Sequence, residues 1–184
     1  MISIKNQTDQ EIETRTRHPL DKADNIYFEM SAAFFGGTGT QQTVFQSYER
    51  NIPILYEMSD YEVCLAGFNI DIEAITLKPN VKRILFLTDR LPVRREFINT
   101  SSRASLEERI LFSYYPSQTE LSTSINLAFN NTLSSNYKDL ENNGELRFID
   151  VFIRVEYFDG TQLPLFGSLT RGSSLLLNFR RKQR

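Results

Sequence analysis

The chain has 184 residues and a formal net charge of -2, and 40% of its residues are apolar, 24% charged and 12% aromatic. This is the composition of an ordinary soluble globular domain, and the near-neutral charge argues against nucleic acid as the principal partner. Because Cys64 and His18 are the only cysteine and histidine, the sequence excludes an intramolecular disulfide and disfavours both the common zinc sites and nucleophilic systems with a histidine base.

Residues 1–25 are predicted to form an extended N-terminal arm, and residues 26–184 one folded domain. The arm is rich in charged residues, and its apolar residues are scattered, so it has too little clustered apolar surface to fold alone. Two interpretations remain open, a mobile tail and a tail that becomes ordered against a partner subunit. The apolar residues for the second interpretation are Ile2, Ile4 and Ile12.

From Ile26 onward the dominant hydrophobic period is two, which is typical of β-strands. The clearest alternation runs over Leu121–Phe129, where one face is apolar and the other polar. A second strand is expected over Arg147–Phe158, and its mixed second face indicates partial cover. Further strands are predicted from their β-branched and aromatic content at Gln42–Tyr48, Tyr61–Ile70, Val81–Leu87, Glu96–Ile98, Arg109–Tyr115, Gln162–Phe166 and Ser173–Phe179.

Turn residues separate these strands. Asp159-Gly160 predicts a hairpin between the strand ending near Phe158 and the next one. The asparagine-rich segment 130–145 predicts a long surface loop with a short helix around Tyr137–Leu140. Residues 104–111 offer one other helical turn, although they suit a loop before a strand equally well.

Many strands, irregular connections and almost no amphipathic helix predict an all-β protein, an antiparallel single jelly-roll sandwich with Greek-key connections and an extended N-terminal arm. Unequal strand spacing favours this connection over a simple meander. The apolar runs are too short to span a membrane, and no signal core precedes them, so we expect no membrane span and synthesis in a reducing compartment.

Candidate chemical sites are weak. A metal-dependent jelly-roll enzyme needs several histidines, which this chain lacks. Asp71 and Glu73 form a short acidic pair that suits a solvated strand end, and Glu107 and Glu108 are consecutive, so their side chains should diverge. We therefore predict no catalytic residue, no metal site and no cofactor, and we expect the protein not to be an enzyme.

The chain closes with basic residues directly after its last predicted strand, Arg180, Arg181 and Lys182 among them. A solvated basic tail is one interpretation. A contact with an acidic surface or with packaged nucleic acid is the other.

The order of several motifs resembles the single jelly-roll minor capsid proteins of virophages, Polinton-like viruses and their large-virus relatives. Residues 61–70 resemble the opening strand of that family, and residues 84–96 resemble its hydrophobic strand followed by Leu-Pro-Val and a glutamate. Residues 109–114 occupy the place of its next short strand. Five later segments resemble the last strands of that family's barrel, namely Leu146–Val151, Val155–Gly160, Leu163–Leu165, Gly172–Ser174 and Leu177–Lys182.

The resemblance implies a penton, a structural virion protein of which five copies surround each icosahedral five-fold vertex beside a double jelly-roll major capsid protein. It implies synthesis inside the host cell and a final location in the virion. The candidate assembly contacts are Ile2, Ile4 and Ile12 in the arm, with Arg180, Arg181 and Lys182 toward an inner layer or an acidic partner. Two alternatives share the strand pattern, a trimeric tumour-necrosis-factor-like or complement-like ligand and a non-catalytic carbohydrate-binding β-sandwich.

Overall fold

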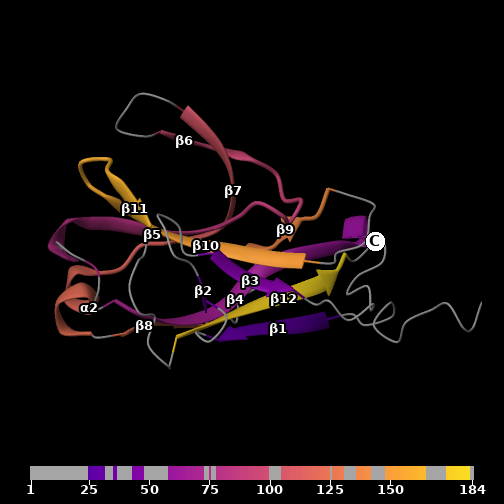
Figure 1. The fold of residues 1–184 in the computed structure, drawn as a ribbon, viewed down its shortest axis with the longest axis horizontal. Coiled ribbons are helices and arrows are strands. Elements are labelled where there is room, and N and C mark those ends of the chain that lie inside the picture. Colours follow the sequence, from indigo (N-terminus) through magenta and orange to yellow (C-terminus); the bar gives the residue numbers. More distant parts are fainter. Residues whose placement is uncertain are drawn as a thin grey trace, which may run out of the picture.

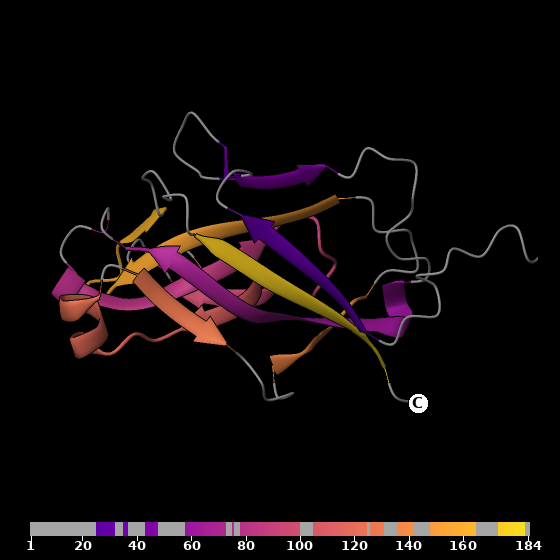
Figure 2. The same cartoon turned by 90° about the horizontal axis from the view of Figure 1, so that it is seen from below.

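A computed structural model of the chain describes 25–31, 35–36, 43–47, 58–72, 75, 78–99, 105–124, 126–130, 136–141, 148–164 and 173–182. The described residues form two antiparallel sheets packed face to face (Figures 1 and 2). The predicted all-β sandwich is therefore confirmed. The arm lies outside the described residues, apart from Asn25, the first residue of the first strand.

The first sheet has the order β1–β12–β4–β8, and a short strand β9 pairs with the start of β4, whereas β8 pairs with the end of β4. Every pairing in it is antiparallel. Its first strand in the chain pairs with its last, so the two ends of the described chain lie side by side. The strands are β1 (Asn25–Ser31), β12 (Ser174–Arg181), β4 (Tyr61–Asp71), β8 (Asn126–Asn130) and β9 (Lys138–Asp139).

The second sheet has the order β2–β3–β10–β5–β7–β6, and β11 pairs with β10. Its central strands β10 and β5 carry most of the side chains discussed below. The strands are β2 (Phe35–Gly36), β3 (Thr43–Ser47), β10 (Phe148–Tyr157), β5 (Val81–Thr88), β7 (Ser105–Tyr114), β6 (Glu96–Asn99) and β11 (Gln162–Pro164).

The strand order is that of a jelly roll. If β1, β3, β4, β5, β7, β8, β10 and β12 are numbered one to eight, the sheets have the orders 1-8-3-6 and 2-7-4-5. These orders arise when two Greek keys wind around one core. Residues 61–70, which resemble the family's opening strand, form the third strand of this order. The segment 25–57, which carries strand-like alternation ahead of them, contributes the opening strand β1, because residues 25–31 pair with β12 along their whole length.

The core lies between the sheets and follows the period of two. On β10, Ile149, Val151, Ile153, Val155 and Tyr157 face inward and are buried, as their alternation predicts. Facing strands add an aromatic cluster in which the Phe68 ring lies 4.8 Å from Phe86, 5.1 Å from Tyr114 and 5.6 Å from Phe129, between ring centroids.

The predicted single strand over Leu121–Phe129 is wrong in its first half. Residues 118–123 form the helix α2 (Gln118–Thr123), and β8 begins only at Asn126. The cause is a capping box: the Ser117 hydroxyl accepts from the Glu120 amide, and the Glu120 carboxylate accepts from the Ser117 amide. These bonds satisfy amides that a helix start leaves open. Leu121 and Leu127 are both buried, so the apolar spacing fits a helix joined to a strand.

The predicted helix around Tyr137–Leu140 is also wrong. Lys138 and Asp139 form β9, and Leu140 makes an isolated bridge with Val93. The Leu140 amide donates to the Tyr61 carbonyl, and the Glu141 amide donates to the Pro92 carbonyl. Bonds to distant strands thus replace helical ones. In the segment 104–111, residues 105–108 form neither the helical turn nor the loop. The strand predicted from Arg109 is confirmed, but it begins four residues earlier, at Ser105.

The hairpin at Asp159-Gly160 is confirmed. Gly160 has a φ of 83°, a left-handed conformation that glycine adopts without steric cost. The Tyr157 amide donates to the Thr161 carbonyl, and the Thr161 amide donates to the Asp159 carboxylate. The turn therefore returns the chain from β10 to β11 in antiparallel register.

Two short 3-10 helices precede long strands: η4 (Lys78–Asn80) leads into β5, and η3 (Met58–Asp60) leads into β4. The Phe158 amide donates to the Asn80 carbonyl, and the Gln118 side chain donates to the Pro79 carbonyl. The β10–β11 turn, η4 and α2 therefore meet at one end of the sandwich (Figure 1).

Candidate functional site

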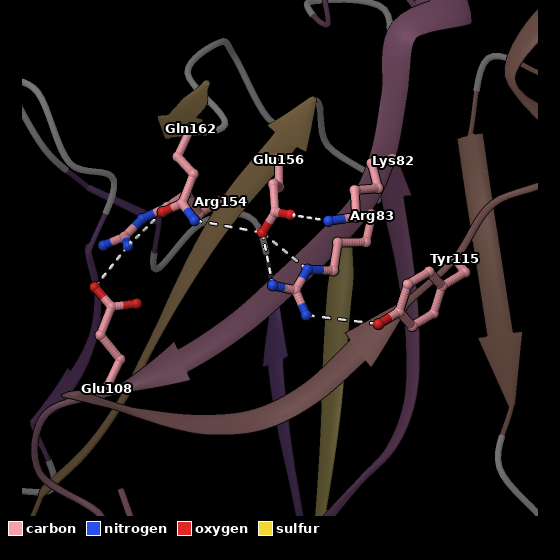
Figure 3. A network of polar contacts seen from close by, with 7 residues as sticks. All are labelled: Lys82, Arg83, Glu108, Tyr115, Arg154, Glu156 and Gln162. Carbon is pink, nitrogen blue, oxygen red and sulfur yellow. Dashed lines mark hydrogen bonds and ion pairs between the residues drawn. The ribbon is translucent and has the colours of Figure 1, made fainter. Parts of the chain in front are cut away.

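The outer face of the β10–β5–β7 sheet carries a network of charged side chains (Figure 3). Glu156 on β10 is at its centre and is only 2% exposed. Its carboxylate accepts from Lys82 Nζ at 2.7 Å, from Arg83 Nε at 2.9 Å and from Arg83 Nη2 at 2.7 Å. Gln162 on β11 donates to the same carboxylate at 3.3 Å. The network ties three strands of the sheet together.

This environment shifts two ionisation equilibria. Burial alone would raise the pKa of Glu156, but the hydrogen bonds from Lys82 and Arg83 outweigh it and hold the pKa below its ordinary value of 4.5. Burial likewise opposes the charge of Arg83, and the bond to Glu156 outweighs it, so the pKa of Arg83 is raised. Both groups are charged in the folded state at neutral pH.

Glu156→Gln should weaken the decrease in the free energy of unfolding that occurs as the pH falls into the acid range. A carboxyl group whose folded pKa is lowered contributes stability that is complete above its unfolded pKa and is lost as the pH falls through the folded pKa. We expect the stability difference between wild type and variant to be constant above pH 5 and to shrink below about pH 4.5. Urea unfolding at several pH values measures it.

The matched control is Glu107→Gln, because the Glu107 side chain is 49% exposed and lies 3.6 Å from Arg95. Exposed pairs of this kind contribute at most about 1 kcal/mol. A Glu156→Gln curve parallel to wild type from pH 3 to pH 7 would show that this carboxylate is not held in its charged form by folding.

Beside the network lies a hollow of about 240 Å³. Its wall includes the buried residues Leu87, Thr88 and Ile153. Leu85, Leu87 and Ile110 form a small apolar cluster against which Phe152 packs. The cluster lies beside Phe152 in the same sheet, and the partial cover of the second face of residues 147–158 stays a prediction. The hollow is lined by Leu87, Thr88, Asp89, Arg95, Glu107, Glu108, Arg109, Phe152, Ile153 and Arg154.

The turn that follows β5 is held by the buried carboxylate of Asp150. It accepts from the Thr88 hydroxyl at 2.6 Å, from the Arg90 amide at 2.9 Å and from the Asp89 amide at 3.1 Å. The Thr88 hydroxyl in turn accepts from the Leu91 amide at 3.1 Å. The edge of the hollow is therefore built on a fixed turn.

The opposite sheet carries a second cluster around Tyr137. The Arg180 guanidinium lies 3.8 Å from the centre of the Tyr137 ring and donates two hydrogen bonds to the Glu62 carboxylate, the one from Nε at 2.7 Å. The Tyr137 hydroxyl donates to Asn178 Oδ1 at 2.6 Å. Cys64, the neighbour of Asn178 across β4 and β12, is buried.

Burial raises the pKa of the Cys64 thiol and the pKa of the Tyr137 hydroxyl, the latter to about 12. Tyr137 partly opposes the effect of burial on the pKa of the thiol. Because the thiolate is the reactive form of cysteine, Cys64 should be inert at neutral pH while the fold is intact.

Thiol labelling tests this cluster. We expect Cys64 in native protein to react with an aromatic disulfide reagent at least a hundredfold more slowly than in urea-unfolded protein. Tyr137→Ala should raise the native rate, because it uncovers the thiol, whereas Tyr115→Ala, on the other sheet, should leave it unchanged. Equal native and unfolded rates would contradict the burial of Cys64.

The structure gives the predicted basic contacts partners within the chain. Arg180 binds Glu62, Arg181 lies 4.0 Å from Asp60, and Lys182 Nζ lies 3.3 Å from Asp139. All three belong to β12 or directly follow it, so they are anchored at the end of a strand. Their contact with another molecule stays a prediction. Ile2, Ile4 and Ile12 lie outside the described residues.

The acidic pair at 71 and 73 differs from its expectation. Asp71 is buried, not solvated, and its amide donates to the Ser173 hydroxyl at 3.1 Å. Glu73 lies outside the described residues. In the part of the chain that the structure describes, no group of three or more His, Cys, Asp or Glu side chains could hold a metal ion, and no helix is long and apolar enough to cross a membrane.

Comparison with known proteins finds a structural likeness only. No protein-family model matches the sequence, and no curated protein matches it. The fold is similar to a crystal structure of the mavirus penton protein, with a TM-score of 0.45 and 17% identity over 56% of this chain and 36% of that chain. It is also similar to a cryo-EM structure of the Sputnik virophage, with a TM-score of 0.47 and 20% identity over 60% of this chain and 32% of that chain. The chain thus spans about a third of the length of each.

Proposed function

We propose that the protein is a penton, a minor capsid protein that forms pentamers at icosahedral five-fold vertices and contacts a double jelly-roll major capsid protein. The observation that carries the proposal is the jelly-roll strand order. The motifs that resemble the family lie along these strands in the same order as in the family. Residues 84–87 belong to β5, the Leu-Pro-Val motif at 91–93 follows it, and Glu96 opens β6. Asp159-Gly160 forms the hairpin before the closing strand β12.

The role would be assembly, not catalysis. A closed ring of identical subunits requires a heterologous contact in which one flank of a subunit fits the opposite flank of the next. A sandwich whose two sheets share one core is stiff enough to keep those flanks at a fixed angle. The turn at Asp150 and the ion-pair network at Glu156 add rigidity to one of the sheets.

Residues 1–25 act as an arm and residues 26–184 as the jelly-roll domain in this proposal. The arm, through Ile2, Ile4 and Ile12, contacts neighbouring subunits. Arg180, Arg181 and Lys182 contact an inner layer or an acidic partner at the end where β12 finishes. The protein is made inside the host cell and ends in the virion.

The first test is the native mass of the purified chain over a range of concentrations, followed by negative-stain class averages of any oligomer. We expect a species of five chain masses and rings with five-fold symmetry. Stable trimers would overturn the proposal in favour of a ligand-like protein. Saturable glycan binding by a strict monomer would overturn it in favour of a carbohydrate-binding module. Failure of the chain to join particles of the major capsid protein would also overturn it.

Deleting residues 1–24 tests the arm. These residues precede β1, which starts at Asn25, so the deletion leaves every described strand intact. We expect unchanged thermal stability and at least a tenfold loss of incorporation into particles. Incorporation equal to that of the full chain would rule the arm out as an assembly element.

A further inference from the structure

The segment 137–141, here named the strap, contacts both sheets of the sandwich. On the side of the first sheet, its strand β9 pairs with the start of β4, with Asp139 opposite Glu62 and Lys138 opposite Val63. β12 pairs with the other edge of β4 at the same two residues. The strap therefore covers the edge of β4 that β12 leaves open.

Other contacts of the strap reach the second sheet. Leu140 makes an isolated antiparallel bridge with Val93, which follows β5, and the Lys138 ammonium binds the carboxylate of Glu96 on β6. β6 stands at the end of the strand order of the second sheet. The strap therefore joins the start of β4 in one sheet to β6 in the other.

The strap also covers polar side chains on the outer face of the first sheet. Cys64 and Asn178 lie opposite each other on β4 and β12, and they alternate with residues that face the core, so both point outward. The outer face of such a sheet is ordinarily solvated, yet these two residues are only 3% and 1% exposed. The Tyr137 hydroxyl donates to Asn178 Oδ1 at 2.6 Å, which places the first residue of the strap against this pair.

Among the described residues, few interactions hold the strap to either sheet. Only two of its residues pair with β4, whereas β12 pairs with β4 along its whole length, and Leu140 is its one buried residue. Its ion pairs are Lys138 with Glu96 and Asp139 with Lys182, in which the acids are 47% and 69% exposed. Exposed ion pairs contribute little and are screened by salt. A segment held in this way opens at a lower free-energy cost than the paired strands beside it.

We infer that the strap opens separately from the rest of the fold, and that ionic strength sets how often it is open. When closed, it joins the two sheets and shields the thiol of Cys64. When open, it leaves the edge of β4 unpaired at Glu62 and Val63 and admits reagents to the thiol. The ladder between β4 and β12 includes no strap residue, so it stays intact. The inference goes beyond the penton proposal and does not depend on it, because it involves a single chain.

The rate at which native protein reacts with an uncharged pyridyl disulfide tests the inference, because Cys64 is the only thiol of the chain. The rate is measured in the full chain at increasing urea concentrations below the unfolding transition. Global unfolding exposes much surface and therefore depends steeply on urea, whereas opening of a short segment does not. At low urea we expect a nearly urea-independent rate, about tenfold or more above the rate that global unfolding allows. A rate that follows global unfolding at every urea concentration would overturn the inference.

Salt and charge variants test what holds the strap closed. The native rate should rise about threefold between 20 mM and 500 mM NaCl, while the rate of the urea-unfolded chain stays the same. Lys138→Gln and Lys182→Gln should each raise the native rate at low salt without moving the urea midpoint, and together they should abolish its salt dependence. Lys78→Gln, which removes the same charge on η4, should change neither. A native rate that ignores salt would overturn the role of the ion pairs, and a midpoint that falls in step with faster labelling would overturn separate opening.

Discussion

Phe68→Ala is expected to lower the free energy of unfolding by about 4 kcal/mol, the largest effect of any single change considered. The Phe68 side chain is buried and lies at the centre of an aromatic cluster, with the rings of Phe86, Tyr114 and Phe129 around it. Truncation removes buried apolar surface and leaves a cavity between the two sheets. The cavity cannot close by a local shift of side chains, because its walls belong to both sheets and Phe86 is on the facing one. Urea unfolding measures the loss.

The matched control is Phe158→Ala. Phe158 is 66% exposed at the β10–β11 turn, so the same truncation there should change the free energy of unfolding by less than about 0.5 kcal/mol. A loss at Phe68 no larger than the loss at Phe158 would contradict the packing of the two sheets around this cluster.

Asp150→Ala is expected to lower the free energy of unfolding by about 3 kcal/mol. The carboxylate is 1% exposed and accepts hydrogen bonds from the Thr88 hydroxyl and from the amides of Asp89 and Arg90. Its removal takes the acceptor from the buried Thr88 hydroxyl and from the two amides, and unsatisfied donors carry most of the cost of a lost hydrogen bond. The turn after β5 should loosen, and hydrogen exchange at the Arg90 amide should accelerate.

Two variants separate this effect from the loss of a side chain. Asp150→Asn keeps the shape and one acceptor oxygen, so it should cost about half as much. Asp159→Ala removes an exposed aspartate that accepts one amide in a turn, and it should cost less than about 1 kcal/mol. If all three variants were equally stable, Asp150 would not be the anchor of the turn.

Much of the fold could be predicted from the sequence because most strands alternate strictly. The buried residues of β10 and the hairpin at Asp159-Gly160 follow directly from period and turn chemistry. The helix α2 was missed because Leu121 and Leu127 are buried in a spacing that a strand also satisfies. The pair Ser117 and Glu120 was the available signal, since a serine followed three residues later by glutamate marks a helix start.

The candidate site was less predictable, because its geometry depends on register between strands distant in sequence. Nothing local in the sequence places Lys82 and Arg83 beside Glu156, yet β5 and β10 pair so that Arg83 lies opposite Glu156. The same holds for Glu108 and Arg154, and for Arg180 and Glu62. The sequence alone shows a polar face on residues 147–158 that is interrupted by Phe152. This pattern indicates that the face is partly buried, but it does not identify the residues that pack against it.

The pairing of the first strand with the last has a consequence for biosynthesis. Sheet β1–β12–β4–β8 cannot be completed until β12, which ends at Arg181, has been made, because β12 lies between β1 and β4. Pairings between such distant segments form slowly, since the entropy of closing the long loop is lost before any favourable contact forms. A nascent chain that has not yet reached β12 therefore exposes the apolar faces of β1 and β4, and it becomes competent to meet its neighbours only after β12 has been made.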